Sequence, residues 1–526
     1  TQATLDTNTI NNLTNAVTRA ESNLHGDTKL QQDKDRAKQA ISQLPNLNDA
    51  QKHMEDSIID SQDTRTNVNQ NITAAQELNG LMGALKESIK DNATIISNGN
   101  YINAEPTKKQ AYDQAVQHAK DIINGTNQPT INKDDVSRAT QTVNNTKVAL
   151  DGDHRLEEAQ NTANQTITNL TNLNNAQKTA EKQLVNQSPT LEQVQQNLQT
   201  AQDLDRAMGA LRQSIANQDQ VKSESKYLNE DPTVKANYDQ AVQRAEDIIN
   251  ATQNPELNKG TIEQATQAVQ NAEQALHGVE KLNQDKTTAS KELNNLTNLT
   301  DAQREKLKEL INHSDSRDDI KQELEQAKQL NNAMEQLKNQ VALKDSVHSS
   351  SNYFNEDSAQ KQAYDDAIKH AEDIIKNTNN PNINPQDIIK ALNNIKTATD
   401  NLHGEQRLQN EKDTSNNSID HMTHLNQPQK DALKQAIDGA TTREQVAEKL
   451  KEAKALDNAM KQLEDQVNQD PAITSSSKFE NEDTEQQKAY NNAINAAKDI
   501  INQTSNPTLD KNKIDDALHN LSLIHI

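Results

Sequence analysis

The residues best suited to bind a metal ion are His421 and His424, which are three positions apart, as two ligands on one helix face can be. The positions 126 residues earlier hold Asn295 and Asn298, so the pair does not recur where other residues do. The tripeptide Asp151-Gly152-Asp153 lacks the remaining ligands of a calcium loop.

Other signatures of catalysis are missing from the sequence. It contains no Gly-rich phosphate loop, no nucleophile elbow and no His-Glu-x-x-His zinc helix. We therefore predict no catalytic, cofactor-binding or metal-binding residue, no cofactor and no enzymatic activity. The ligand-binding residues stay unassigned.

The composition limits the class of partner. With 55 basic and 78 acidic residues the formal charge is −23, which disfavours binding to nucleic acid and to anionic lipid. The absence of cysteine excludes disulfides and thiolate metal sites. No apolar run is long enough for membrane insertion and no signal peptide is present, so we expect any export or anchoring signal to lie outside this chain.

One predicted helix recurs along the chain, and we call it the organising helix. Its sequence pattern is clearest from Thr442 to Val467. Its apolar residues follow steps of three and four, which place one stripe on one helix face. Thr442 and Gln445 form the pattern of a capping box at its start. Since the stripe is narrow, the helix must lie against partner helices.

The same helix recurs at intervals of 126 residues, and we use "column" for the residues at one position of successive repeats. One column holds Met82, Met208, Met334 and Met460, and the cap column holds Thr64, Thr190, Ser316 and Thr442. Four copies at constant spacing indicate a repeat architecture.

Each repeat contains two groups of helices. A helix after a Leu-x-Gly tripeptide, a second helix capped by Asn or Thr with Gln three residues later, and the organising helix are predicted to form one three-helix bundle. A polar link, a helix containing Tyr112 or its equivalents, and an Asn-capped helix complete the second group.

These patterns predict an all-α fold of tandem three-helix bundles joined end to end into an elongated rod, monomeric, with two bundles in each repeat. The first range, 1–25, is the last helix of a module whose earlier part is missing. The first bundles of the repeats are 26–94, 152–220, 278–346 and 404–472, and the second bundles are 95–151, 221–277, 347–403 and 473–526.

Glycines and aromatic residues occupy fixed columns. Gly26, Gly152, Gly278 and Gly404 either end the preceding helix or lie inside a continuous one, and we expect hinges there. Eight of the nine aromatic residues form two columns of the second bundle, with one ring expected in the core and the other at the bundle end. The ending Leu523-Ile524-His525-Ile526 departs from the pattern, which we interpret as a truncation or a tail.

Two motifs carry a family resemblance over nearly the whole chain. The pattern Tyr-x-x-Ala-[Val/Ile]-x-x-Ala-x-x-Ile-Ile at 112–123, 238–249, 364–375 and 490–501 resembles FIVAR modules. The preceding group, with Ala-Met at 207–208, 333–334 and 459–460 and Leu81-Met82 in the first copy, resembles GA modules. Strict alternation of the two is similar to the giant staphylococcal matrix-binding adhesins.

The resemblance implies a fibrous protein of the bacterial cell wall whose repeats bind host fibronectin or another matrix protein. Some GA relatives bind serum albumin, but the departure at Leu81 and the length of these bundles argue against albumin here. The alternative is a passive spacer or cell-envelope tether without a ligand in this segment.

Overall fold

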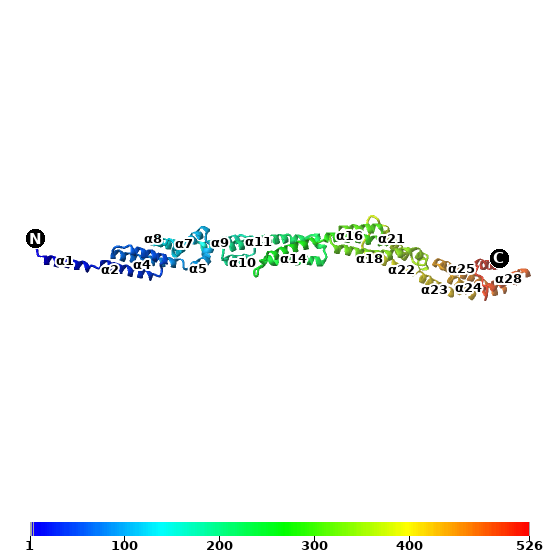
Figure 1. Cartoon of the computed structure of the whole chain (residues 1–526). Coiled ribbons are helices and arrows are strands. Elements are labelled where there is room, and N and C mark those ends of the chain that lie inside the picture. The colour runs from blue at the N-terminus through cyan, green and yellow to red at the C-terminus, as the bar shows by residue number, and fades with distance from the viewer. Residues whose placement is uncertain (1–2, 4, 525–526) are drawn as a thin grey trace. The chain divides into compact units, whose positions relative to one another are not determined.

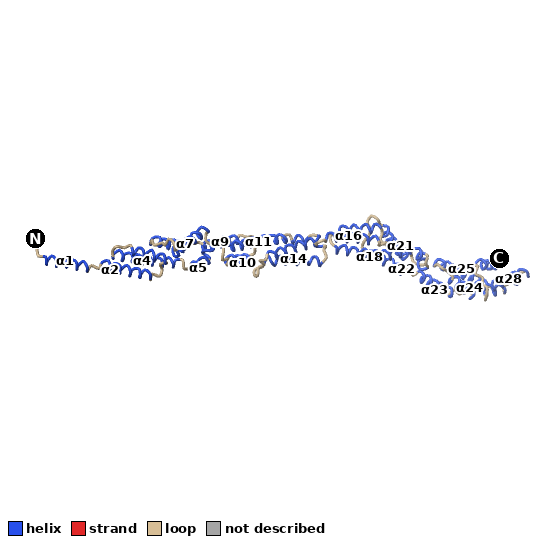
Figure 2. Tube along the Cα trace, viewed as in Figure 1, coloured by secondary structure: helices blue, strands red, loops and turns tan. Residues whose placement is uncertain are grey.

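The computed structural model describes residue 3 and residues 5–524, and within them it contains helices and loops but no strand (Figures 1 and 2). The predicted all-α class is confirmed. Helices group into two compact units, residues 1–222 with 231–276 and residues 223–230 with 277–526. His525 and Ile526 of the predicted tail lie outside the described residues, whereas Leu523 and Ile524 continue the last helix.

The first unit begins with α1 (Thr7–Ser22), which Asp6 caps as predicted. The first repeat follows as α2 (Gly26–Ser42), α3 (Asp49–Asp60), α4 (Arg65–Ser88), α5 (Asn92–Ser97), α6 (Gly99–Ile102), α7 (Pro106–Asn124) and α8 (Lys133–Val148). The second repeat supplies α9 (Gly152–Thr168), α10 (Asn175–Asn186), α11 (Leu191–Ile215), α12 (Gln218–Ser223), α14 (Pro232–Asn250) and α15 (Lys259–Gln274).

The second unit contains the remaining helices. They are α13 (Ser225–Leu228), α16 (Gly278–Asn294), α17 (Asp301–His313), α18 (Arg317–Ala342), α19 (Lys344–His348), α20 (Ser351–Phe354), α21 (Ser358–Lys376), α22 (Pro385–Asp400), α23 (Gly404–Asp420), α24 (Gln427–Asp438), α25 (Arg443–Val467), α26 (Asp470–Thr474), α27 (Ser477–Glu480), α28 (Thr484–Ile501) and α29 (Lys511–Ile524). The expected polar link is thus a pair of short helices in each repeat.

Side-chain caps start the helices where the sequence predicts. Thr442 accepts a hydrogen bond from the Gln445 backbone N–H, and the Gln445 side chain accepts one from the Thr442 N–H. The same reciprocal box opens the second helix of all four repeats, at Asn48, Asn174, Thr300 and Asn426. These boxes satisfy backbone donors that the first turn of a helix leaves without partners.

The long organising helix belongs to two bundles in every repeat. In the first repeat, Val68 and Ala75 of α4 pack in a core with residues of α2 and α3, whereas Leu78, Met82 and Leu85 pack with α7 and α8. We call these the first and second bundle. The predicted ranges 26–94 and 95–151 assign all of α4 to the first bundle, but a helix of 24 residues is long enough to supply one stripe to two successive cores.

The cores of the two bundles are separate in the first repeat and continuous in the third and fourth. One position on the second helix differs accordingly: it holds the buried carboxylates Glu55 and Glu181 in the first two repeats and the buried leucines Leu307 and Leu433 in the others. Leu307 belongs to a single cluster running from Leu282 to Leu402. The continuous cores thus occur in the two repeats that carry leucine at this position.

Candidate functional site

The two candidate metal-binding histidines do not share a helix. α23 ends at Asp420, and His421 Nδ1 lies 2.7 Å from the carbonyl oxygen of Asn417. His424 Nδ1 instead lies 2.6 Å from Glu464 Oε2 on α25. Within the described residues no group of three or more His, Cys, Asp and Glu could hold a metal ion.

The aromatic columns build the core of the second bundle. Tyr112, Tyr238, Tyr364 and Tyr490 are buried, as predicted for the core ring. The other column is half-buried, and its rings meet the core rings edge to face, with centroids 6.1 Å apart for Tyr101 and Tyr112 and 6.0 Å apart for Tyr353 and Tyr364. Burial raises the pKa of Tyr112 and of Tyr364 to about 12, so both hydroxyls are neutral at physiological pH.

Three of the four glycines are points of close contact between the end of one repeat and the start of the next, which we call junctions. A Cβ on Gly152 would lie 2.3 Å from the carbonyl oxygen of Asn100, and one on Gly404 would lie 2.3 Å from that of Asn352. A Cβ on Gly278 would lie 2.5 Å from the Lys226 carbonyl oxygen. No glycine among the described residues has a positive φ, so backbone conformation does not explain the glycines at these three positions. Glycine is required there because a side chain would collide with neighbouring backbone.

The helix does not run through these glycines. α8 ends at Val148 and α9 begins at Gly152, and the same break separates α22 from α23. Neighbouring backbone surrounds Gly152, Gly278 and Gly404, and the hinge expectation stays a prediction for these three. Gly26 has no such neighbour among the described residues.

An asparagine fastens each junction from the other side. Asn103 Nδ2 donates to the Pro189 carbonyl at 3.0 Å, and its Oδ1 accepts from the Leu191 N–H at 2.9 Å. Asn355 makes the same two bonds to Thr441 and Arg443, at 3.1 and 2.9 Å. Asn229 repeats them to Asp315 and Arg317 within the second unit.

A carboxylate completes each junction. Asp151 accepts the Glu105 N–H at 3.0 Å and the Lys108 ammonium at 2.8 Å, and these bonds, with that of Lys108 the largest, lower its pKa. In the later junctions Glu356 accepts the His403 N–H and Glu230 accepts the His277 N–H, and both side chains are fully buried. Burial raises the pKa of Glu356, but bonds from the Asp357 and His403 N–H groups and from Arg407 outweigh it and the pKa is lowered.

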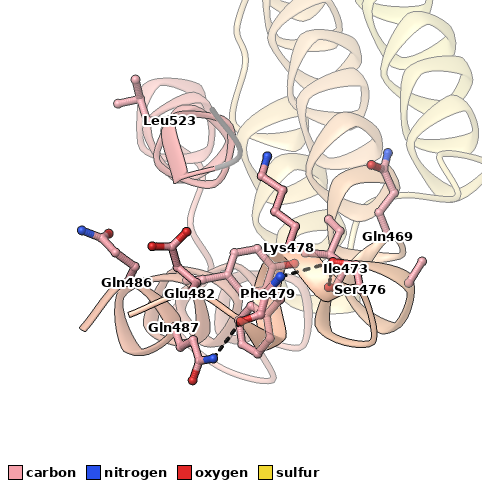
Figure 3. A pocket seen from close by; sticks show the side chains of 11 residues that line it. Gln469, Ile473, Ser476, Lys478, Phe479, Glu482, Gln486, Gln487 and Leu523 are labelled. Atoms are coloured by element: carbon pink, nitrogen blue, oxygen red, sulfur yellow. Dashed lines mark hydrogen bonds between the residues drawn. The ribbon is translucent and has the colours of Figure 1, made fainter. Parts of the chain in front are cut away.

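A pocket of about 620 Å³ lies near the end of the second unit (Figure 3). Its walls include Ile473, Phe479 and Glu482, with Leu523 of α29 across from them. The Gln487 side chain donates to the Phe479 carbonyl at 2.7 Å.

The corresponding place in the first and third repeats belongs to a core leucine. Leu150 packs in one cluster with Ile95, Tyr101 and Tyr112, which stand in the columns of the pocket residues Ile473, Phe479 and Tyr490. Leu402 does the same in the third repeat. The residues that line the pocket therefore stand in core columns of the second bundle.

Sequence reasoning missed the junction residues, although one signal for them was present. The residue two positions after the second aromatic column is asparagine in all four repeats: Asn103, Asn229, Asn355 and Asn481. A polar residue held constant next to varied neighbours indicates a specific hydrogen bond. The carboxylate carried no such signal, because it changes column between junctions.

Family models match along the whole series of repeats. The GA module matches residues 27–81, 153–207, 279–333 and 405–459. The FIVAR domain matches residues 81–151, 207–277, 333–403 and 459–523. The chain belongs to the family of alternating GA and FIVAR modules. The two models meet inside α4, α11, α18 and α25, where the packing divides the first bundle, the GA module, from the second, the FIVAR module.

The curated relatives are large matrix-binding proteins. The chain is 46% identical over 513 residues to the extracellular matrix-binding protein ebh of Staphylococcus aureus strain MRSA252, and 47% identical to EbhA of strain Mu3. These matches cover 98% of this chain but only 5% and 8% of the relatives, so the chain spans a small part of their length.

Two solved structures are similar in sequence. A domain of EbhA from Staphylococcus aureus is 35% identical, covering 47% of this chain and 98% of that one, with a TM-score of 0.43. A structure from work on Embp-mediated adherence of Staphylococcus epidermidis to fibronectin is 38% identical, covering 24% of this chain and 98% of that one, with a TM-score of 0.23. Among the described GA and FIVAR helices none has the length and apolar character of a bilayer span.

Proposed function

We propose that this chain is a repeat segment of a bacterial cell-surface adhesin that binds a host extracellular matrix protein, with fibronectin as the first candidate. The supporting observation is the match of 98% of the chain to proteins named extracellular matrix-binding. The repeats display the same helical faces four times, and many weak contacts of one kind give avidity when the ligand also repeats. The role is adhesion at the cell surface, outside the cell, and does not include catalysis.

We also propose that the chain is monomeric and extended, as its series of tandem repeats predicts. Three junction glycines are enclosed by backbone, and shared helices join the GA and FIVAR modules of each repeat. Small-angle scattering of chains with one, two and four repeats tests this proposal: a maximum dimension that grows in proportion to repeat number supports it, and a constant dimension contradicts it.

A fibronectin titration tests the ligand. Chains that start at residue 26 and end at 151, 277 or 526 contain one, two or four repeats without cutting a shared helix. Affinity for immobilised fibronectin should rise with the number of repeats, and circular dichroism should confirm equal helicity per residue. Binding that is equal for one and four repeats would contradict the multivalent mechanism.

A passive spacer is the second candidate, and the nature of the repeated residues favours it. Several of the columns that hold one residue type in all four repeats, such as the Met82 column, are core positions. Selection for a rigid scaffold alone would produce that pattern. Failure of the four-repeat chain to bind fibronectin, albumin or immunoglobulin would support the spacer over the adhesin.

A further inference from the structure

At each of the three junctions one carboxylate accepts a backbone N–H bond, and it comes from the GA side at the first junction and from the FIVAR side at the next two. At the first junction the residue before the glycine is Asp151, and the facing residue on the FIVAR side is Ala104, which is buried. At the next two junctions the carboxylate lies on the FIVAR side and a histidine precedes the glycine. Glu230 faces His277, and Glu356 faces His403.

The carboxylate serves the same groups from either side. Asp151 accepts the N–H of Glu105, the residue that caps α7, at 3.0 Å. Glu356 accepts the N–H of Asp357, the equivalent cap of α21, at 2.8 Å. Both carboxylates therefore lie where the start of a FIVAR helix meets the start of a GA helix, and both helix starts favour a negative charge.

A basic residue on the first turn of the GA helix has a different partner according to which side supplies the carboxylate. Lys281 pairs with Glu230, and Arg407 lies 2.5 Å from Glu356. At the first junction the equivalent Arg155 donates instead to the Asn103 carbonyl at 3.0 Å, and Asp151 pairs with Lys108 of the FIVAR helix.

Two carboxylates at this acceptor position would repel each other, whereas a position with none would leave a backbone N–H without its acceptor. We propose that this requirement for one carboxylate is a pairing rule between neighbouring modules: a FIVAR module with Glu in the Ala104 column fits a GA module that begins with His-Gly, and one with Ala fits a GA module that begins with Asp-Gly.

The rule also assigns a partner to the last FIVAR module of this sequence. Glu482 stands in the Glu230 and Glu356 column, and Asn481 stands in the column of the fastening asparagines. The surface that contains them fits the start of a GA module with His-Gly and a basic residue four positions after the histidine. His25-Gly26 with Lys29 is a start of that kind.

A double-mutant cycle in the full chain tests the rule. Ala104→Glu places a second carboxylate beside Asp151, and Asp151→His removes the carboxylate that accepts the Glu105 N–H. The double variant recreates the arrangement of Glu356, His403 and Arg407, with Arg155 as the base. Amide hydrogen exchange, measured in peptides covering 98–110 and 148–160, reports on this junction alone. Peptides covering the third junction serve as the internal control.

Each single substitution should speed exchange at the first junction by about tenfold, and the double variant should restore most of the protection, as expected for residues coupled through contact. Exchange in the double variant that equals the product of the two single effects would overturn the rule, as would single variants that match the parent chain.

The reverse cycle, Glu356→Ala with His403→Asp, repeats the test at a junction where neither substitution adds bulk. It keeps the proposal testable if Ala104→Glu prevents folding of its module. Rescue in this cycle supports the rule, and additivity overturns it.

Discussion

Gln51 of α3 donates its side-chain N–H to the backbone carbonyl of Thr130 at 2.6 Å, across the boundary between a GA module and the FIVAR module that follows it. The same side chain accepts the Asn48 N–H at 3.0 Å and is fully buried. One glutamine thus caps a helix and holds the loop of the adjacent module. The other repeats contain the same bond, as Gln177 to Glu256, Gln303 to Asn382 and Gln429 to Thr508, at 2.7–2.8 Å.

Replacing this glutamine should loosen both modules of one repeat. Gln303→Leu leaves the Thr300 N–H and the Asn382 carbonyl without their partner, which costs about 1–3 kcal/mol when such groups are buried. Hydrogen exchange should accelerate in α17 and in the loop at 377–384. Gln336→Leu on the exposed face of α18 is the control, and equal exchange in the two variants would contradict the role of Gln303.

Adding one methyl group should have opposite effects at two glycines. In Gly404→Ala the new Cβ meets the Asn352 carbonyl oxygen at 2.3 Å and the backbone of Asn355 and Glu356 at 2.7 Å, so the third junction must open. Gly80→Ala, on the exposed side of α4, meets no atom within 4 Å and should stabilise that helix by about 1 kcal/mol. Thermal unfolding with junction-specific hydrogen exchange separates the two results, and equal destabilisation would refute the steric argument.

The helices were predictable because their signals are local. The stripe of Val446, Leu456 and Met460, and the cap pair Thr442 and Gln445, lie within one segment and need no tertiary information. The sharing of α4 by two bundles was not predictable in this way. A continuous apolar stripe does not indicate which helices pack against its first half and which against its second. The role of Gly152 was missed for a similar reason: it depends on Asn100, a residue far along the chain whose backbone approaches closely only in the folded structure.

The buried Glu181 should cost stability at neutral pH. Burial raises its pKa from 4.5 to about 6, and Oε2 has no hydrogen-bond partner. A raised pKa means that the stabilising contribution is present below pH 4.5 and is lost as the pH rises through 6. Glu181→Leu, which copies Leu307, should therefore stabilise this GA module by roughly 2 kcal/mol at pH 7 and by much less at pH 4.

Hydrogen exchange of α10 amides, corrected for intrinsic rates at each pH, measures this gain. Leu307→Glu is the reciprocal variant, and it should weaken the third GA module increasingly between pH 5 and pH 7. A gain from Glu181→Leu that does not change with pH would show that packing alone accounts for it.

The junction carboxylates should respond to pH in the opposite direction. Hydrogen bonds from Asp357, His403 and Arg407 lower the pKa of Glu356 below 4.5 despite its burial, so its contribution is present above pH 4.5 and is lost as the pH falls through the lowered value. Glu356→Gln should weaken protection of the α23 start at pH 7 and remove its acid sensitivity. Hydrogen exchange between pH 7 and pH 3, with the Asp151 junction as the unchanged control, measures both effects. A variant that keeps the acid sensitivity of the parent chain would place the responsible group elsewhere.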